Sequence, residues 1–198
     1  MRQSGALADL IVALRCLPGI GPKSAQRMTL HLLQRDREGA HRLAESLRAA
    51  LDRVHLCAQC NILTEGALCS LCSSPLRDRS QLCIVETPAD VYAIDEATNY
   101  KGLFFVLNGR LSPLDGIGPR ELRMDRLEKN FESGEVQEVI LATNATVEGE
   151  ATAHYISEMA RHYRIRATRI AHGVPFGGEL EYVDGTTLSH AFDGRNEL

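Results

Sequence analysis

Four of the six cysteines in this 198-residue chain form two identical pairs, Cys57-x2-Cys60 and Cys69-x2-Cys72, separated by eight residues. Each pair places two thiolates on one tight knuckle, and two knuckles supply the tetrahedral four-sulfur set that zinc prefers. Two disulfides or two redox motifs are the alternatives, but a cytosolic chain of this size favours neither. The spacing therefore predicts one structural zinc ion per chain, since no ligand position stays open for water.

A helix-hairpin-helix pattern lies near the N-terminus, at Leu17-Pro18-Gly19-Ile20-Gly21-Pro22-Lys23-Ser24-Ala25. Gly19 and Gly21 permit a tight turn whose backbone N–H groups point outward at a helix N-terminus, where a phosphate can bind. Lys23 and Arg27 are four residues apart, so they share a helix face and both can reach phosphates without reading bases. We expect these four residues to contact single- or double-stranded DNA. A purely structural turn that mediates self-association is the alternative.

Three acids lie where a parallel sheet would present them to a ligand. Glu86 ends the predicted strand over 82–85, and the carboxyl ends of such strands are where ligands bind in open α/β sheets. Glu148 and Glu150 begin a predicted helix just after Thr146. Together the three could hold Mg²⁺ through oxygen ligands. Alternatively, Glu148 and Glu150 simply favour the helix dipole next to a Thr146 cap. We assign all three to partner contacts or structure.

The net charge of −4 hides a polarity along the chain. Residues 1–55 carry nine Lys and Arg against five Asp and Glu, residues 56–80 are balanced, and residues 81–198 carry eleven against nineteen. An acidic total argues against a protein that coats nucleic acid over its whole surface, whereas a basic N-terminal module permits local DNA contact. No apolar run approaches a membrane span, so we expect a cytoplasmic protein without membrane contact.

The elements that must position these residues change type near residue 81. Hydrophobic periodicity predicts helices over 6–15, 22–34 and 36–55 before the cysteines. After them, strands over 82–85, 103–107, 138–141 and 165–168 alternate with helices over 88–97, 123–132 and 149–162, which is typical of a parallel α/β sheet. The irregular stretch 108–120 is long enough to suggest a functional loop. Cys16 and Cys83 have apolar neighbours and are expected to be buried.

In this order, the motifs resemble the RecR recombination-mediator family over essentially the whole chain. The most specific runs are Leu111-Ser112-Pro113-Leu114-Asp115-Gly116-Ile117-Gly118-Pro119 and Thr146-Val147-Glu148-Gly149-Glu150-Ala151-Thr152-Ala153. Residues 17–27, 138–144 and 169–175 and the cysteine quartet support them. The resemblance implies a mixed α/β multidomain protein: a helix-hairpin-helix module over 1–55 for DNA binding and oligomerisation, a four-cysteine zinc finger over 56–76, a Toprim domain over 80–175 and a C-terminal oligomerisation segment over 176–198.

The resemblance also implies a function. Family members are ring-forming DNA clamps, dimers that associate into tetramers, which act with RecO and RecF to help load RecA at single-stranded gaps. Such a protein would be associated with the nucleoid. Catalytic Toprim enzymes pair a strand-end Glu with a later Asp-x-Asp, but here that place reads Ala142-Thr143-Asn144. Because an amide lacks the charge that holds Mg²⁺, we expect no enzymatic activity. A Mg²⁺-dependent nuclease or topoisomerase-like enzyme, and a RecO scaffold that does not touch DNA, are the alternatives.

Overall fold

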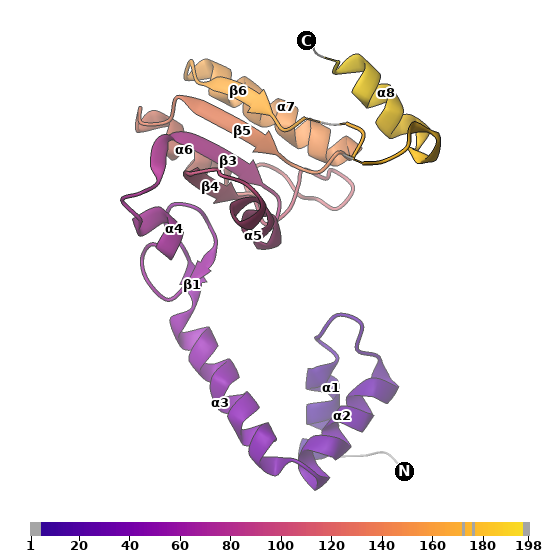
Figure 1. Cartoon of the computed structure of the whole chain (residues 1–198). Coiled ribbons are helices and arrows are strands. Elements are labelled where there is room, and N and C mark those ends of the chain that lie inside the picture. Colours follow the sequence, from indigo (N-terminus) through magenta and orange to yellow (C-terminus); the bar gives the residue numbers. More distant parts are fainter. Residues whose placement is uncertain (1–4, 172, 176, 196–198) are drawn as a thin grey trace. The chain divides into compact units, whose positions relative to one another are not determined.

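The computed structural model describes residues 5–171, 173–175 and 177–195. Contacts within the chain group it into two compact units, Met1–Val54 and His55–Leu198. We call them the helical unit and the α/β unit and describe each by itself (Figure 1). No helix in the described ranges is long and apolar enough to cross a membrane.

The helical unit contains α1 (Ala6–Leu14), α2 (Pro22–Gln34) and α3 (Arg37–Arg53). Proline at the first position of α2 suits a helix start, since its missing N–H has no partner to lose there. The Asp36 side chain caps α3 by accepting a 2.8 Å hydrogen bond from the Gly39 N–H. α1 packs on α2 and α2 packs on α3.

The α/β unit begins with the two cysteine knuckles. A short antiparallel ladder joins β1 (His55–Leu56) to β2 (Leu63–Thr64), and α4 (Ser70–Ser73) carries the last cysteine. The ladder pairs the residues on either side of the first knuckle and so closes it. This small lobe then leads directly into the central sheet.

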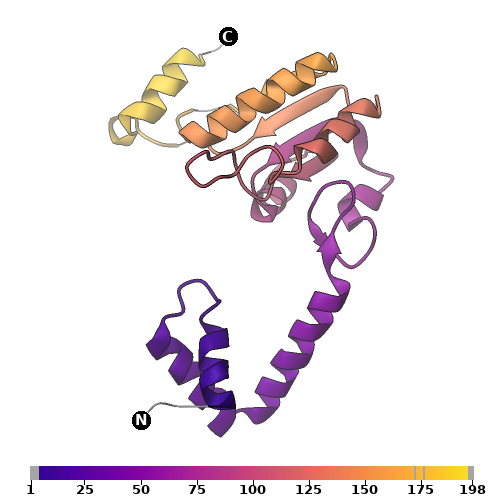
Figure 2. The same ribbon diagram turned by 180° about the vertical axis from the view of Figure 1, so that it is seen from behind.

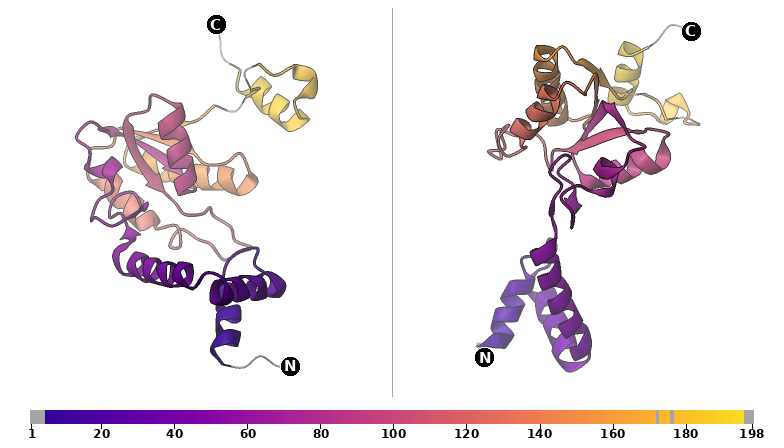
Figure 3. Two further views of the ribbon diagram at one scale, coloured as in Figure 1. Left: turned by 60° about the horizontal axis from the view of Figure 1, so that its bottom comes forward. Right: turned by 90° about the vertical axis from the view of Figure 1, so that its left-hand side faces the viewer.

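The sheet has four parallel strands in the order β4-β3-β5-β6, namely Gly102–Val106, Asp78–Val85, Glu138–Ala142 and Arg166–Arg169. The connecting helices are α5 (Pro88–Ala97), α6 (Met124–Glu132) and α7 (Val147–His162). Figure 2 shows α6 and α7 in front of the sheet, and the right panel of Figure 3 shows α5 on the other side of the strands. The unit therefore has the layered α/β/α arrangement expected for a Toprim-type domain.

Alternation along the central strands divides the core into two faces. Leu82, Ile84 and Phe105 point to the side of α6 and α7, where they pack with residues such as Leu127 and Ile156. Cys83, Val85, Phe104 and Val106 point to the opposite side and pack with Val91 of α5 and with the four paired cysteines. The knuckles thus share one hydrophobic cluster with the sheet.

Several boundaries differ from the sequence prediction. α3 and α6 are shorter than expected, and the last strand starts one residue later. A helix that sequence analysis missed, α8 (Gly185–Asp193), follows a short 3-10 turn (Leu180–Tyr182) near the C-terminus. Cys83 is buried as predicted, but the prediction for Cys16 is wrong, because Cys16 is exposed in the turn that follows α1.

Candidate functional site

The four paired cysteines converge in one buried cluster. Their sulfur atoms all lie within 4.8 Å of one another, and each cysteine is at most 6% exposed. The Sγ atoms of Cys60 and Cys69 lie 3.5 Å apart, well beyond the roughly 2.05 Å of a disulfide, and all the cysteines are free. Among the described residues this is the only group of acids, cysteines and histidines that brings its ligand atoms together in this way.

The pKa values of three of the four thiols indicate that the cluster cannot hold several thiolates without a cation. A hydrogen bond with Cys72 lowers the pKa of Cys60 to about 6, and the same bond raises the pKa of Cys72. Burial raises the pKa of Cys69 to about 11. Without a metal, one thiolate is therefore stabilised at the expense of its neighbours, since like charges cannot accumulate in a buried site. A divalent cation with four sulfur ligands removes this conflict, so the quartet suits zinc binding.

The predicted DNA-contact residues lie on and beside the hairpin of the helical unit. Gly19 has φ +76°, a conformation that favours glycine, and the Ile20 N–H donates to the Leu17 carbonyl to close the turn. Gly21 precedes α2 in an extended conformation that any residue can adopt. Lys23 and Arg27 are both exposed on α2.

Lys23 and Arg27 also line one hollow in the surface of α2. The hollow is completed by the side chains of Gln26, Leu30, His31, Gln34 and Arg35. Three of the seven lining residues are permanently cationic, and none of the seven is acidic. The geometry thus gathers the two predicted cations into a basic surface and adds Arg35, which sequence analysis did not single out.

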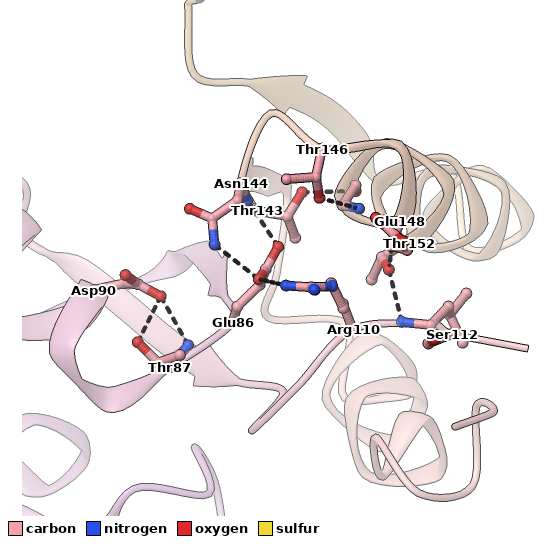
Figure 4. Close-up of polar contacts among 12 residues, drawn as sticks. Glu86, Thr87, Asp90, Arg110, Ser112, Thr143, Asn144, Thr146, Glu148 and Thr152 are labelled. Atoms are coloured by element: carbon pink, nitrogen blue, oxygen red, sulfur yellow. Dashed lines mark hydrogen bonds and ion pairs between the residues drawn. The ribbon is translucent and has the colours of Figure 1, made fainter. Parts of the chain in front are cut away.

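The carboxylate of Glu86 lies at the carboxyl edge of the sheet and is engaged by groups from two other elements (Figure 4). Its two oxygens accept 2.8 Å hydrogen bonds from the backbone N–H and the side-chain amide of Asn144. The Arg110 guanidinium lies 3.9 Å away. At 3% exposure, Glu86 is buried. A buried charge needs such partners, and the Asn144 amide and the Arg110 guanidinium supply them here.

Glu148 and Glu150 do not join Glu86 in a ligand set. The Thr146 side chain caps α7 by accepting a hydrogen bond from Gly149, and Glu148 and Glu150 lie in the first turn, as the capping alternative predicts. Glu150 forms an ion pair with Arg169, which also donates a 2.8 Å hydrogen bond to the Thr143 hydroxyl.

The assignment of these three acids to partner contacts stays a prediction. Their burial differs, so they are not equally accessible to a partner. Glu86 is nearly inaccessible, whereas Glu148 is half-buried and Glu150 exposed. Arg110 and Arg169 were missed as site residues, because nothing local in the sequence indicates which acid each one contacts, whereas the Asp-x-Asp comparison already relates Asn144 to Glu86.

Fold and sites together define the class: a helix-hairpin-helix module, a four-cysteine zinc finger and a Toprim-type sheet in one chain. Sequence comparison agrees, with matches to the Toprim domain over residues 80–171, the RecR helix-hairpin-helix over 7–51, the RecR four-cysteine zinc finger domain over 54–74 and the RecR C-terminal region over 173–196.

Curated relatives match the whole chain. It is 72% identical to the recombination protein RecR of Methylococcus capsulatus over 198 residues, which is 100% of both chains. It is 61% identical to the recombination protein RecR of Saccharophagus degradans over 195 residues, covering 98% of this chain and 99% of the relative. The chain therefore belongs to the RecR family, whose proteins act in recombinational DNA repair.

Proposed function

We propose that this chain is a non-enzymatic recombination mediator: a ring-forming DNA clamp that acts with RecO and RecF to help load RecA at single-stranded gaps. The observation that carries the proposal is the basic hollow beside a glycine hairpin in a chain of the RecR family. DNA contact, self-association, zinc binding and partner contact each have their own support in the residues of the chain.

DNA contact is supported by Gly21. Its extended backbone does not require glycine, and a Cβ at this position would meet no other atom of the chain within 4 Å. Nothing inside the helical unit therefore explains why the residue has no side chain. Close approach of an external phosphate to the start of α2 does explain it, because a side chain would hold the phosphate away from the N–H groups. Lys23 and Arg27 would then contact neighbouring phosphates.

Assembly with further copies is supported by the apolar surface of the helical unit. Of its described residues, 5–54, only Ala25 and Thr29 are buried, whereas Leu43, Leu47 and Leu51 of α3 are 54%, 59% and 76% exposed. These leucines recur every fourth residue, so they form one stripe along the helix. Large apolar stripes on soluble proteins mark interaction sites, and a second copy of α3 would cover this one. Dimers that associate into a tetrameric ring follow from the family resemblance.

For zinc, we propose one ion per chain in a structural role. All four ligand positions are taken by cysteine, and the cluster is buried against the sheet. Closed sites of this kind stabilise folding and leave no place for a reacting water.

Contact with RecO is assigned to the loop over 108–120 together with the half-buried Glu148 and the exposed Glu150. The loop is ordered by a bridge between Ser112 and Ile117, and its tip residue Leu114 is 98% exposed. An isolated apolar side chain held out on an ordered loop is suited to insertion into a partner's pocket.

Substitutions at Gly21 test the DNA proposal. Asp and Asn are both good helix N-caps, so Gly21→Asp and Gly21→Asn keep or slightly raise the melting temperature. Both side chains obstruct the phosphate, and Asp adds repulsion, so we expect Gly21→Asn to weaken binding to a labelled oligonucleotide and Gly21→Asp to weaken it further.

Parent-like binding by both variants at every salt concentration, with or without RecO, would show that the hairpin is only structural and favour the scaffold alternative. The enzyme alternative has its own test. Mg²⁺-dependent nicking or relaxation of a plasmid, abolished by Glu86→Ala, would overturn the proposal.

A further inference from the structure

A second basic hollow lies on the α/β unit, where the 108–120 loop ends and α6 begins. It is lined by Arg120, Glu121, Arg123, Asp125 and Arg126, around the start of α6. We infer that this arginine hollow binds a phosphate of the same nucleic-acid strand that the helical unit holds, and that Asn61 of the first zinc knuckle positions one of its arginines. The inference rests on the proposed DNA binding.

The acids of the hollow are already engaged. The Glu121 carboxylate accepts a 2.9 Å hydrogen bond from the Gly118 N–H, and backbone N–H groups hold its pKa below the usual range. Asp125 lies in the first turn of α6, where the helix dipole favours a negative charge. In the described part of the chain, no acid lies within ion-pair distance of Arg120 or Arg123. The Glu121 charge attracts Arg120 without forming an ion pair with it, so both guanidinium groups can still bind an anion from outside.

The backbone at Arg123 supports a role in binding. Arg123 is the N-cap of α6 and adopts a left-handed conformation, with φ +54° and ψ +39°. Arginine gains nothing from this conformation, which is uncommon for residues other than glycine, asparagine and aspartate. Strained residues of this kind cluster at binding sites, where the surrounding structure holds them in place.

The third arginine is held by the zinc knuckle. Asn61 directly follows the ligand Cys60 and is fully buried, with φ +62°. Its side-chain oxygen accepts a 3.2 Å hydrogen bond from Arg126, and its side-chain nitrogen donates at 3.2 Å to the Val106 carbonyl at the end of β4.

The Asn61 backbone carbonyl is used as well, since it accepts a 3.2 Å hydrogen bond from the Asn108 side chain. One residue of the knuckle thus ties together the strand end, the start of the 108–120 loop and an arginine of the hollow. Metal binding at the knuckle would fix Asn61, and through it the direction of the Arg126 guanidinium.

A nucleic-acid strand fits this hollow better than a free anion does. Three arginines against two acids leave a net charge of only +1, which attracts a lone phosphate weakly. A strand already bound to the helical unit presents its other phosphates to the rest of the same chain at raised effective concentration, so weak contacts add to its affinity. Arginine suits such contacts because its planar fork matches two phosphate oxygens.

The test compares salt dependences in the full-length protein, using a labelled oligothymidylate. Each phosphate contact contributes about 0.7 to the slope of log affinity against log salt for single strands. We expect Arg120→Ala and Arg123→Ala each to lower the slope by about that amount. The control is Arg161→Ala, which removes an exposed arginine that is paired with Glu158 in the same unit and leaves the slope unchanged.

The outcomes separate this inference from the proposed function. If Lys23→Ala with Arg27→Ala lowers the slope while both hollow variants keep it, the helical unit binds DNA and the hollow does not. A parent protein without salt-dependent binding, alone and with RecO, overturns both.

The Asn61 step has its own readout. Asn61→Gly keeps the left-handed backbone accessible and removes the side chain, with its hydrogen bonds to Arg126 and to the Val106 carbonyl. Because the cysteines are untouched, we expect the zinc content to stay at the parent level, and metal analysis checks this. We expect Asn61→Gly and Arg126→Ala to weaken binding by similar factors, with no further loss when they are combined. Additive losses would show that Asn61 does not act through Arg126.

Discussion

Replacing Asn144 by Asp would turn an amide that neutralises Glu86 into a second carboxylate against it. The side-chain amide of Asn144 lies 2.8 Å from one Glu86 oxygen, and Glu86 is 3% exposed. Two carboxylates at this distance cannot both stay ionised, so the pair in the variant would keep one proton that both groups lose in the unfolded chain at neutral pH. Holding that proton at pH 7 costs at most about 1.4 kcal/mol for each unit between pH 7 and the ordinary pKa near 4, about 4 kcal/mol in all; the solvent exposure of residue 144 and the nearby Arg110 guanidinium lower the cost below this limit.

This cost sets the expected pH dependence. The folded pKa of the pair is raised above its unfolded value, so the variant's deficit is largest at and above pH 7 and shrinks as the pH falls toward about 4. With about 2–4 °C per kcal/mol for a chain of this size, this upper limit corresponds to a fall of about 8–16 °C in the melting temperature at pH 7, and the measured fall should be smaller. Mg²⁺ should restore part of the lost stability, because two adjacent carboxylates form a site for a hard cation. A free Mg²⁺ concentration of 100 times the dissociation constant would stabilise the folded variant by about 2.7 kcal/mol.

Asn144→Ala is the matched control. It removes the same donor without adding charge, so it should cost about 1.5–3 kcal/mol at all pH values from 5 to 8 and should not respond to Mg²⁺. Differential scanning calorimetry of both variants, across pH and with or without Mg²⁺, decides the matter. Equal deficits at every pH, indifferent to Mg²⁺, would refute the view that Asn144 stands in for a cation beside Glu86.

Four further predictions use other parts of the chain. Cys57→Ser should lose zinc, measured by metal analysis, and unfold at lower temperature. Gly149→Ala should destabilise by about 1–3 kcal/mol in denaturant titration despite the better helix former, because its Cβ would lie 2.1 Å from a backbone oxygen. Leu47→Glu should lower the mass measured by light scattering without lowering stability. In the zinc-loaded protein, Cys16 should react with iodoacetamide at pH 8, whereas Cys83, whose pKa burial raises to about 12, should not.

Local patterns carry much of this fold. Leucine spacing, Pro22 and the Asp36 cap predict the first helices, and the cysteine spacing predicts the buried quartet. These features depend on residues close together in the sequence, where periodicity and capping are decisive. The alternation of strands with helices likewise predicts the parallel sheet, whose two faces follow from the pleat.

What sequence reasoning missed depends on contacts between distant segments. Arg110 and Asn144 come together at Glu86 only after the strands have assembled, and Asn61 meets Arg126 across 65 positions of the chain. Cys16 has apolar neighbours in sequence, yet it is exposed in the turn after α1. The core of the helical unit is small, and few of its described residues are buried. Contacts between residues far apart in the chain follow from the tertiary fold, and they leave no periodic pattern in the sequence.

The cysteine quartet is better understood as part of the sheet than as an appended finger. Its sulfurs share a hydrophobic cluster with Phe104 and Val85, and the Cys60 carbonyl accepts a 2.8 Å hydrogen bond from the Val106 N–H at the end of β4. Metal binding there would therefore stabilise the strand whose end leads into the 108–120 loop. Few basic residues surround the quartet, so it has little means of contacting DNA itself. Its contribution to DNA binding would instead pass through Asn61, which spans the distance from the metal to the arginine hollow.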